Sequence, residues 1–320
     1  MDRFQRFLNL PCATVDADFN AIRLSQHRKD FLAKAVDGTP IFLLHDASQA
    51  HYSPGIEFKH VKAKFHVTCR VSVGDKQFEE QFALVTIDGA MHDLYELFIR
   101  CFAAAIENLP VNSGTRELSD CVQKLTGLFR SLAQPNSKAV TGIWGELFVI
   151  ANSVNVTSAI ASWQVDSFDR FDFSWGNRVL EVKATTQAIR IHHFAVAQLA
   201  EPISGSGYVA SLMLQPLSGG LGIIDLANTI ETKLTNFPDL KIKLWANLAM
   251  ALGDGFTTKL DKRFDMDYAT RHFVLYAMND IPRPELPSDS RITEIRFTAD
   301  LATVDSSINK PSFAVLREIF

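Results

Sequence analysis

Two carboxylates and a lysine stand out in residues 170–185, RFDFSWGNRVLEVKAT, which otherwise read as two strands joined by a tight turn. Charged side chains are costly in half-buried strands, so these charges need a physical reason. Gly176 and Asn177 suit the centre of a type II′ turn, whose first position needs a positive φ. With these two residues as the loop, Asp172 lies directly opposite Glu181, with the Cβ atoms roughly 5 Å apart.

Lys183 belongs to the same group, because side chains two residues apart on a strand share a face. Two neighbouring carboxylates repel each other and raise one pKa unless a cation neutralises them. Mg²⁺ suits this position because it needs only one or two protein carboxylates and completes its shell with water and substrate phosphate. Lys183 would then orient or deprotonate a water, or stabilise the charge that develops on the phosphate. The opposite face carries four apolar side chains suited to the core: Phe171, Phe173, Leu180 and Val182.

A simpler interpretation is a surface ion pair, in which Lys183 contacts Asp172 or Glu181 on a solvated hairpin. An acidic residue two positions before a lysine is common on strands and is weak evidence by itself. The cross-strand match and the apolar opposite face favour the metal site. Asp166 and Asp169 precede the first strand and are second choices as ligands, since neither falls opposite Glu181.

Other polar residues near the hairpin allow a purely structural interpretation as well as a functional one. His192 and His193 are neighbours on an expected strand, so they point to opposite faces and at most one faces the site. Thr185 and Thr186 could donate to a phosphate, but threonine is also typical of strands.

The elements around the hairpin predict helices beside a mixed central sheet. We expect a helix at 137–152, a strand at 159–165 before the hairpin, the two hairpin strands at 170–175 and 178–185, and a strand at 189–194 after it. A helix or helical turn at 195–203 and a strongly apolar strand at 207–217 follow. The first helix has an apolar side with two glycines, Gly142 and Gly145, which permit close packing on a sheet.

Asp172, followed on the next strand by Glu181-Val182-Lys183 and preceded by a helix bearing Glu146, resembles the PD-(D/E)XK nuclease superfamily. The wider pattern, GIWGELFVI…WQVDSFDRFDFSWGNRVLEVKATT…RIHHFAVAQL, is similar to a family of uncharacterised bacterial members linked to restriction and phage-defence loci. The resemblance covers residues 138–200 well and implies an α-β-β-β-α-β core like that of restriction endonucleases. No proline precedes the aspartate, where Phe171 stands instead.

The resemblance also implies residue roles. Asp172 and Glu181 would be the metal-binding carboxylates and Lys183 the catalytic lysine. Glu146 would join the metal or water network from the first helix, although a solvated helix glutamate is the alternative. Gln198 would lie near the site from the second helical segment, although a glutamine there is also an ordinary solvated residue. The implied cofactor is Mg²⁺, for which Mn²⁺ could substitute.

The rest of the chain predicts an α+β or α/β protein with two domains. Residues 1–135 form a β-meander with strands at 40–45, 64–73 and 76–87, followed by two amphipathic helices. Residues 136–320 form the nuclease-like core, with helices near 221–235 and 239–251 and strands at 272–278 and 291–299. The boundary lies at Pro135, Asn136 and Ser137, where a helix stop precedes a turn.

Composition excludes several classes of protein. The 320 residues are 47% hydrophobic and 21% charged with a net charge of −4, so no global basic character indicates a protein that coats DNA. No apolar run suits a signal peptide or a membrane span, so we expect a cytoplasmic protein without membrane contact. The four cysteines contain no C-x-x-C pair and read as buried thiols in a reducing compartment. No nucleotide-binding loop, H-E-x-x-H or G-x-S-x-G motif occurs.

These observations predict a Mg²⁺-dependent deoxyribonuclease, more an endonuclease than an exonuclease, acting in restriction or phage defence. DNA is the expected partner, and the resemblance implies an ATPase, helicase or methyltransferase subunit that supplies recognition. A homo-oligomer is compatible with the sequence. Two alternatives stay open: a catalytically silent nucleic-acid-binding or scaffold subunit, and a phosphohydrolase acting on a small substrate.

Overall fold

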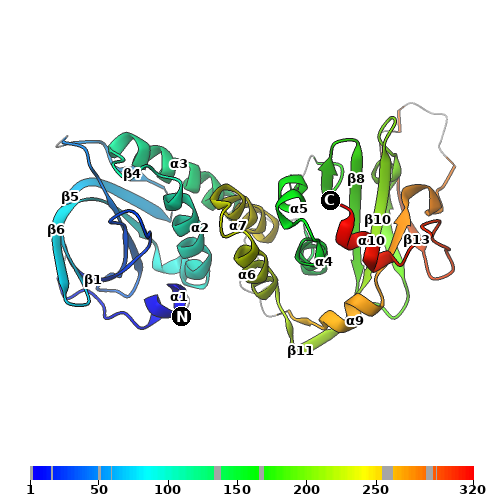
Figure 1. Ribbon diagram of the computed structural model, residues 1–320, viewed down its shortest axis with the longest axis horizontal. Coiled ribbons are helices and arrows are strands. Elements are labelled where there is room, and N and C mark those ends of the chain that lie inside the picture. The colour runs from blue at the N-terminus through cyan, green and yellow to red at the C-terminus, as the bar shows by residue number, and fades with distance from the viewer. Residues whose placement is uncertain are drawn as a thin grey trace. The chain divides into compact units, whose positions relative to one another are not determined.

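The chain divides into two compact units, Met1–Pro135 and Asn136–Phe320. Each unit has its own sheet and helices, and each is described by itself (Figure 1). The computed structural model describes residues 3–15, 17–49, 52–58, 60–132, 138–165, 169–253, 262–285, 291–292 and 294–320.

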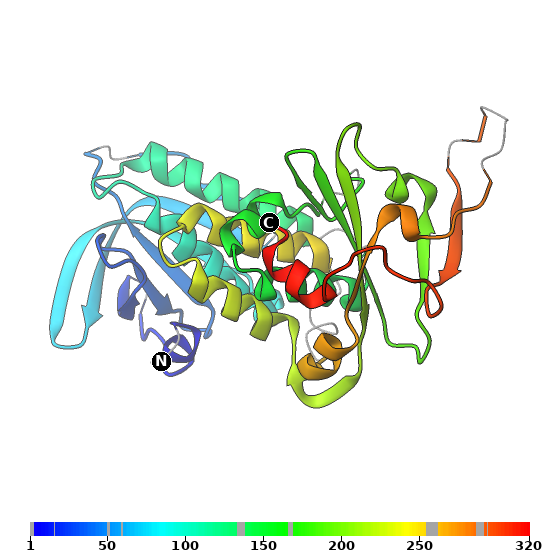
Figure 2. The same cartoon turned by 45° about the vertical axis from the view of Figure 1, so that its right-hand side comes forward.

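The strands of the N-terminal unit close into a ring. Their pairing order is β1-β2-β3-β6-β5-β4, and β1 also pairs in parallel with β5, which closes β1, β2, β3, β6 and β5 into a ring with β4 as an additional strand beside β5 (Figures 1 and 2). The sequence predicts only the hairpins of this region, so the closure by β1 is new. The strands are β1 (Asp18–Arg23), β2 (Phe31–Lys34), β3 (Pro40–His45), β4 (Ile56–Glu57), β5 (Val61–Val73) and β6 (Lys76–Ile87).

Helices accompany this barrel, and the two predicted from apolar periodicity are present as α2 and α3. α2 buries one continuous apolar surface that includes Leu97, Phe98 and Phe102. Cys69, Cys101 and Cys121 are buried and free, as predicted for core thiols, whereas Cys12 is exposed and the prediction is wrong there. The helical elements are α1 (Arg3–Leu8), η1 (Gly89–Leu94), α2 (Tyr95–Glu107) and α3 (Thr115–Leu132).

The C-terminal unit contains the mixed sheet that the sequence predicts, in the order β12-β10-β8-β7. β8 pairs in parallel with β10 and antiparallel with β7, and β10 pairs antiparallel with β12. A second sheet pairs β9 with β13. The strands are β7 (Phe173–Trp175), β8 (Arg178–Thr185), β9 (Ile191–Ala195), β10 (Ser206–Met213), β11 (Pro216–Leu221), β12 (Val274–Ala277) and β13 (Arg296–Asp300).

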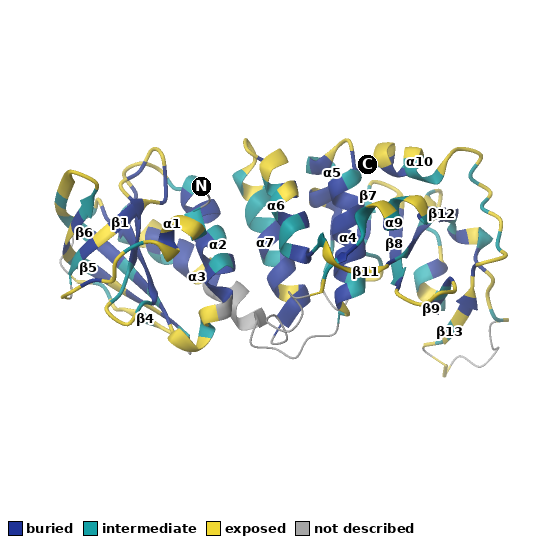
Figure 3. Cartoon of the chain, turned by 90° about the horizontal axis from the view of Figure 1, so that it is seen from below, coloured by how far each residue is buried: buried dark blue, intermediate teal, exposed yellow. Residues whose placement is uncertain are grey.

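The helix α4 covers the middle of this sheet and is buried along most of its length (Figure 3). Gly145 explains the close packing, since a Cβ there would lie 3.1 Å from Val182 Cγ1 and 3.3 Å from Ala184 Cβ on β8. The helical elements of the unit are α4 (Val140–Asn152), α5 (Val156–Ser162), η2 (Val196–Leu199), α6 (Ile223–Lys233), α7 (Pro238–Leu252), α9 (Met266–Arg271), η4 (Met278–Asp280) and α10 (Ser312–Glu318).

Three details differ from the sequence prediction. The strand expected at 159–165 is wrong: residues to Ser162 belong to α5, whose start is capped by Asn155, and only Trp163 makes a single bridge to Phe173. The strand expected at 189–194 exists as β9 but lies outside the main sheet. The second helix of the expected core is the short turn η2. Short apolar segments of this kind suit either a strand or a helix, so tertiary packing decides between them.

Candidate active site

The hairpin that carries the predicted site has the predicted register. The structure pairs Phe173 with Leu180 and Trp175 with Arg178. Gly176 has a φ of +55°, which the first central position of a type II′ turn requires. β7 covers only the first part of β8, so β8 continues past its neighbour from Glu181 onward.

Asp172 directly precedes the first residue of β7, and its side chain bonds to the backbone of β8 where the strand pairing has stopped. Its Oδ2 accepts a hydrogen bond of 2.8 Å from the backbone N–H of Val182. In the same place its backbone carbonyl accepts from the N–H of Gln164 at 2.8 Å. The carboxylate of Asp172 is thereby fixed beside the backbone that carries Glu181.

Glu181 is the centre of one hydrogen-bonded group. Its Oε1 contacts Lys183 Nζ at 2.8 Å and accepts from Gln198 Nε2 at 2.6 Å. Gln198, in the short helical turn η2, also accepts from Lys183 Nζ at 3.1 Å and from the backbone N–H of Ala195 at 3.0 Å, and these bonds fix its side-chain amide. The structure therefore brings together three of the predicted site residues from β8 and η2.

Glu146 belongs to a second group, which is linked to Asp172 by a lysine. Lys138 Nζ lies 2.9 Å from Glu146 Oε1 and 3.0 Å from Asp172 Oδ1. The other oxygen of Glu146, Oε2, accepts a hydrogen bond of 2.7 Å from Trp163 Nε1. Because Glu146 is only 2% exposed, it is no solvated helix residue.

Burial and mutual repulsion determine the charge state of this site. Burial and the charge of Asp172 together raise the pKa of Glu181 to about 8, against the opposing effect of Lys183. Burial and Asp172 likewise raise the pKa of Glu146 to about 7 against the effects of Lys138 and Trp163. For Lys138, burial lowers the pKa, but the attraction of Glu146 and Asp172 outweighs it and raises the pKa overall.

The surface ion-pair interpretation describes this geometry poorly. Glu181 does contact Lys183, but its side chain is 4% exposed and that of Lys183 is 17% exposed. Asp172 is paired with Lys138 and not with Lys183. A buried cluster of three carboxylates and two lysines is costly to assemble, which is typical of functional sites.

The remaining sequence candidates lie away from these carboxylates. His192 is buried against Ser211 Oγ at 2.7 Å, and burial lowers its pKa to about 3. His193 faces outward to Thr298. Asp169 is exposed. Asp166 lies outside the described residues.

Thr185 and Thr186 follow the strand interpretation. Thr185 is the last residue of β8, and its hydroxyl accepts from the backbone N–H of Gln187 at 3.1 Å. Thr186 is exposed and follows the strand.

Sequence reasoning missed Lys138 and Trp163. Neither has a periodic relation to the carboxylates that it contacts: Lys138 is eight residues before Glu146, and Trp163 is seventeen residues after it. Tertiary packing alone brings them to the site. The one available signal was a basic residue close before a helix that bears a predicted catalytic acid.

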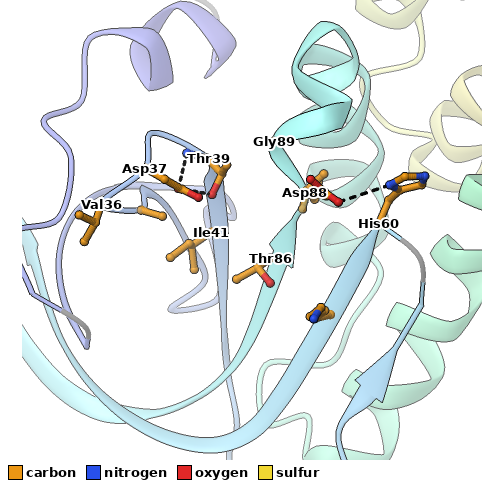
Figure 4. Close-up of a pocket in the computed structure, with 11 residues that line it drawn as sticks. Val36, Asp37, Thr39, Ile41, His60, Thr86, Asp88 and Gly89 are labelled. Carbon is orange, nitrogen blue, oxygen red and sulfur yellow. Dashed lines mark hydrogen bonds and ion pairs between the residues drawn. The ribbon is translucent and has the colours of Figure 1, made fainter.

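The N-terminal unit has a hollow of about 660 Å³ beside β3, β5 and β6 (Figure 4). Its acidic side chains interact with neighbours: Asp37 accepts from Thr39, and Asp88 lies 3.6 Å from His60. Because these carboxylates are separated in different loops, the hollow offers no equivalent of the group around Asp172.

The residues present are suited to a hard divalent cation. Carboxylate oxygens are the ligands that Mg²⁺ prefers, and Lys138 already places a positive charge between two of the three carboxylates. Among the described residues no three His, Cys, Asp or Glu side chains converge closely enough to hold a metal by themselves. Two carboxylates, completed by water and phosphate, are nevertheless sufficient for Mg²⁺.

Comparison with protein families gives a match over most of the chain. The family described as "Putative PD-(D/E)XK family member, (DUF4420)" matches residues 9–302. No curated protein and no solved structure matches the chain. In the described part of the chain, no helix has the length and apolar character needed to cross a membrane.

Proposed function

Because the chain belongs to this PD-(D/E)XK family, we propose that it is a metal-dependent nuclease that hydrolyses phosphodiester bonds of DNA. The observation that carries the proposal is the position of Asp172 and Glu181. Both carboxylates are fixed where β8 extends beyond its pairing with β7, and Lys183 follows Glu181 by two residues on β8. This is the order of acidic and basic residues from which the superfamily takes its name.

In the proposed mechanism, Asp172 and Glu181 would hold Mg²⁺ or Mn²⁺, and Glu146 would complete the acidic network from α4. The bound cation supplies the charge that activates a water and polarises the scissile phosphate. Lys183 donates a hydrogen bond to the attacking water or to the phosphate oxygen on which charge develops. Gln198 holds both Lys183 and Glu181 and so keeps the ammonium aligned.

We propose endonucleolytic cleavage in restriction or phage defence, with recognition supplied by an ATPase, helicase or methyltransferase subunit. The net charge of −4 and the absence of a recognised motor motif from the sequence support a division of labour between subunits. A scaffold subunit without activity is the alternative, and a small-substrate phosphohydrolase is another. A buried acidic cluster costs stability and has no evident purpose in a scaffold, so catalysis is the better explanation.

The test is cleavage of supercoiled plasmid and of linear DNA with Mg²⁺, with Mn²⁺ and with EDTA. We expect the wild type to nick or linearise the plasmid only with metal, and Lys183→Met and Asp172→Asn to lose at least about a hundredfold in rate. Lys233→Met is the matched control, because among the described residues the ammonium of Lys233 donates a hydrogen bond only to the carbonyl of Ala151, at 2.7 Å.

Three results would lead to different conclusions. Equal cleavage by Lys183→Met and wild type contradicts the assignment of Lys183. DNA binding in a gel-shift assay without cleavage under either metal supports the scaffold alternative. Hydrolysis of bis-p-nitrophenyl phosphate without cleavage of either DNA supports the small-substrate alternative.

A further inference from the structure

Lys138 occupies the place between Asp172 and Glu146 where positive charge is most strongly attracted. Its Nζ is within 3.0 Å of one oxygen from each carboxylate. The side chains of Glu146 and Asp172 are 3% and 13% exposed, so little water screens the attraction. The contact is therefore a built feature of the site and more than a surface ion pair.

The oxygen of Asp172 that Lys138 contacts is the one available to a cation. Oδ2 of Asp172 is already engaged by the backbone N–H of Val182, and Oδ1 faces Lys138. A divalent cation at Oδ1 would lie close to the ammonium group, and two cations at such a distance repel each other strongly. Lys138 and a metal ion thus compete for one carboxylate oxygen.

Formal charge supports the same conclusion. Asp172, Glu181 and Glu146 carry −3 when ionised, and Lys138 with Lys183 supplies +2. Adding a divalent cation to the complete group gives +4 against −3. Exchanging Lys138 for the cation gives +3 against −3, so the exchange leaves a neutral site.

The two lysines differ in how firmly their backbones are held. Lys183 lies in β8 and pairs with Ser211 in the centre of the sheet. Lys138 lies in no helix or strand, two residues before α4 begins and three residues after Pro135, where the N-terminal unit ends. Lys138 can move away from the carboxylates through backbone as well as side-chain torsions, whereas the backbone of Lys183 is fixed by strand pairing and its ammonium is held by both Glu181 and Gln198.

We propose that Lys138 is an internal counter-ion that offsets part of the acidic charge of the site in the metal-free protein and is displaced when a divalent cation binds at Asp172. The inference rests on the proposed function, because it requires a metal site at these carboxylates. It makes Lys138 a residue that sets metal affinity, and it separates its role from that of Lys183, which stays in place in both states.

The test is Mn²⁺ binding by isothermal titration calorimetry at pH 8.5, together with the rise in melting temperature that Mn²⁺ produces. We compare wild type with Lys138→Met, Lys138→Gln and Lys138→Arg. Glutamine keeps a donor to the carboxylates without a charge and serves if the methionine variant does not fold. Lys233→Met again controls for loss of a lysine elsewhere in the same unit.

We expect Lys138→Met and Lys138→Gln to bind Mn²⁺ at least about tenfold more tightly than wild type, because no ammonium has to be displaced. Mn²⁺ should also raise their melting temperatures by more than it raises that of wild type. Lys138→Arg should bind Mn²⁺ no more tightly than wild type, and Lys233→Met should equal it.

Unchanged or weaker Mn²⁺ binding by both folded neutral variants overturns the inference while the wild-type metal site stands. Absence of Mn²⁺ binding from the wild type and from every variant overturns the inference together with the proposed metal dependence. The two failures are therefore distinguishable in one titration series.

Discussion

Replacing Glu181 by glutamine removes a carboxyl group whose pKa burial and the nearby charge of Asp172 raise to about 8. From the ordinary value of 4.5, this increase corresponds to at most about 5 kcal/mol of lost stability at pH 8 and above. Glutamine brings an NH₂ donor to a position where Lys183 and Gln198 already donate, and an unpaired donor costs about 1–3 kcal/mol. We therefore expect metal-free Glu181→Gln to be more stable than wild type by about 2–4 kcal/mol at pH 8.5.

The dependence on pH separates this cause from any general change in packing. Between pH 4.5 and 8 the folded protein retains a proton on Glu181 that the unfolded chain has released, so the free energy of unfolding of wild type falls as the pH rises. As the pH falls through 4.5 the unfolded chain takes up the same proton, and this difference in protonation is lost. The variant should then be the less stable protein, and the two stability curves should cross between about pH 5 and 7.

Urea unfolding in EDTA, followed by circular dichroism from pH 4.5 to 8.5, measures both curves. Glu294→Gln is the control, because the side chain of Glu294 is 56% exposed and pairs with Arg296 at the surface. That control should stay within about 0.5 kcal/mol of wild type throughout. A difference between Glu181→Gln and wild type that is constant with pH refutes the assignment of a raised pKa to Glu181.

Three further predictions concern the residues that support the site. Gly145→Val should lower the free energy of unfolding by about 1–3 kcal/mol, because the new side chain would meet β8. Gly142→Ala has open space around the new methyl group and should raise the free energy of unfolding by up to about 1 kcal/mol. Thermal unfolding measures both changes. Trp163→Phe removes the donor to Glu146 and should cost about 1–3 kcal/mol in urea unfolding, and a stability equal to wild type contradicts the importance of that bond. His192→Gln should make the free energy of unfolding less sensitive to acid, because between pH 6.5 and about 3 only the unfolded wild type protonates His192. The expected loss of stability of wild type from this cause is about 2 kcal/mol at pH 5. Parallel pH profiles of stability for variant and wild type would contradict the lowered pKa of His192.

The hairpin shows how much of the candidate site can be predicted from local sequence. Gly176 is suited to the positive φ of the turn, and the turn fixes the register of β7 against β8. Alternation then assigns Glu181 and Lys183 to one face of β8. These relations hold because each depends on residues fewer than about a dozen positions apart, where backbone geometry dominates. The same local logic predicts α4, the helix that bears Glu146, from its apolar side.

Longer-range features did not follow from local patterns. The segment 159–165 reads as a strand by its apolar run, but its residues up to Ser162 form the end of α5, because packing decides the structure of short apolar segments. The N-terminal strands close into a ring through the parallel pairing of β1 with β5, whose paired residues lie about fifty positions apart. No hairpin pattern encodes such a pairing.

The sequence by itself determined which residues could do chemistry and which strand face they share, because side-chain alternation and turn geometry are local. Only the tertiary structure decided their charge state and partners. Burial raises the pKa values of Glu181 and Glu146, and folding brings Lys138 and Trp163 to carboxylates that are distant in the chain. Both effects arise from exclusion of water and from packing of separate elements, which no short stretch of sequence contains.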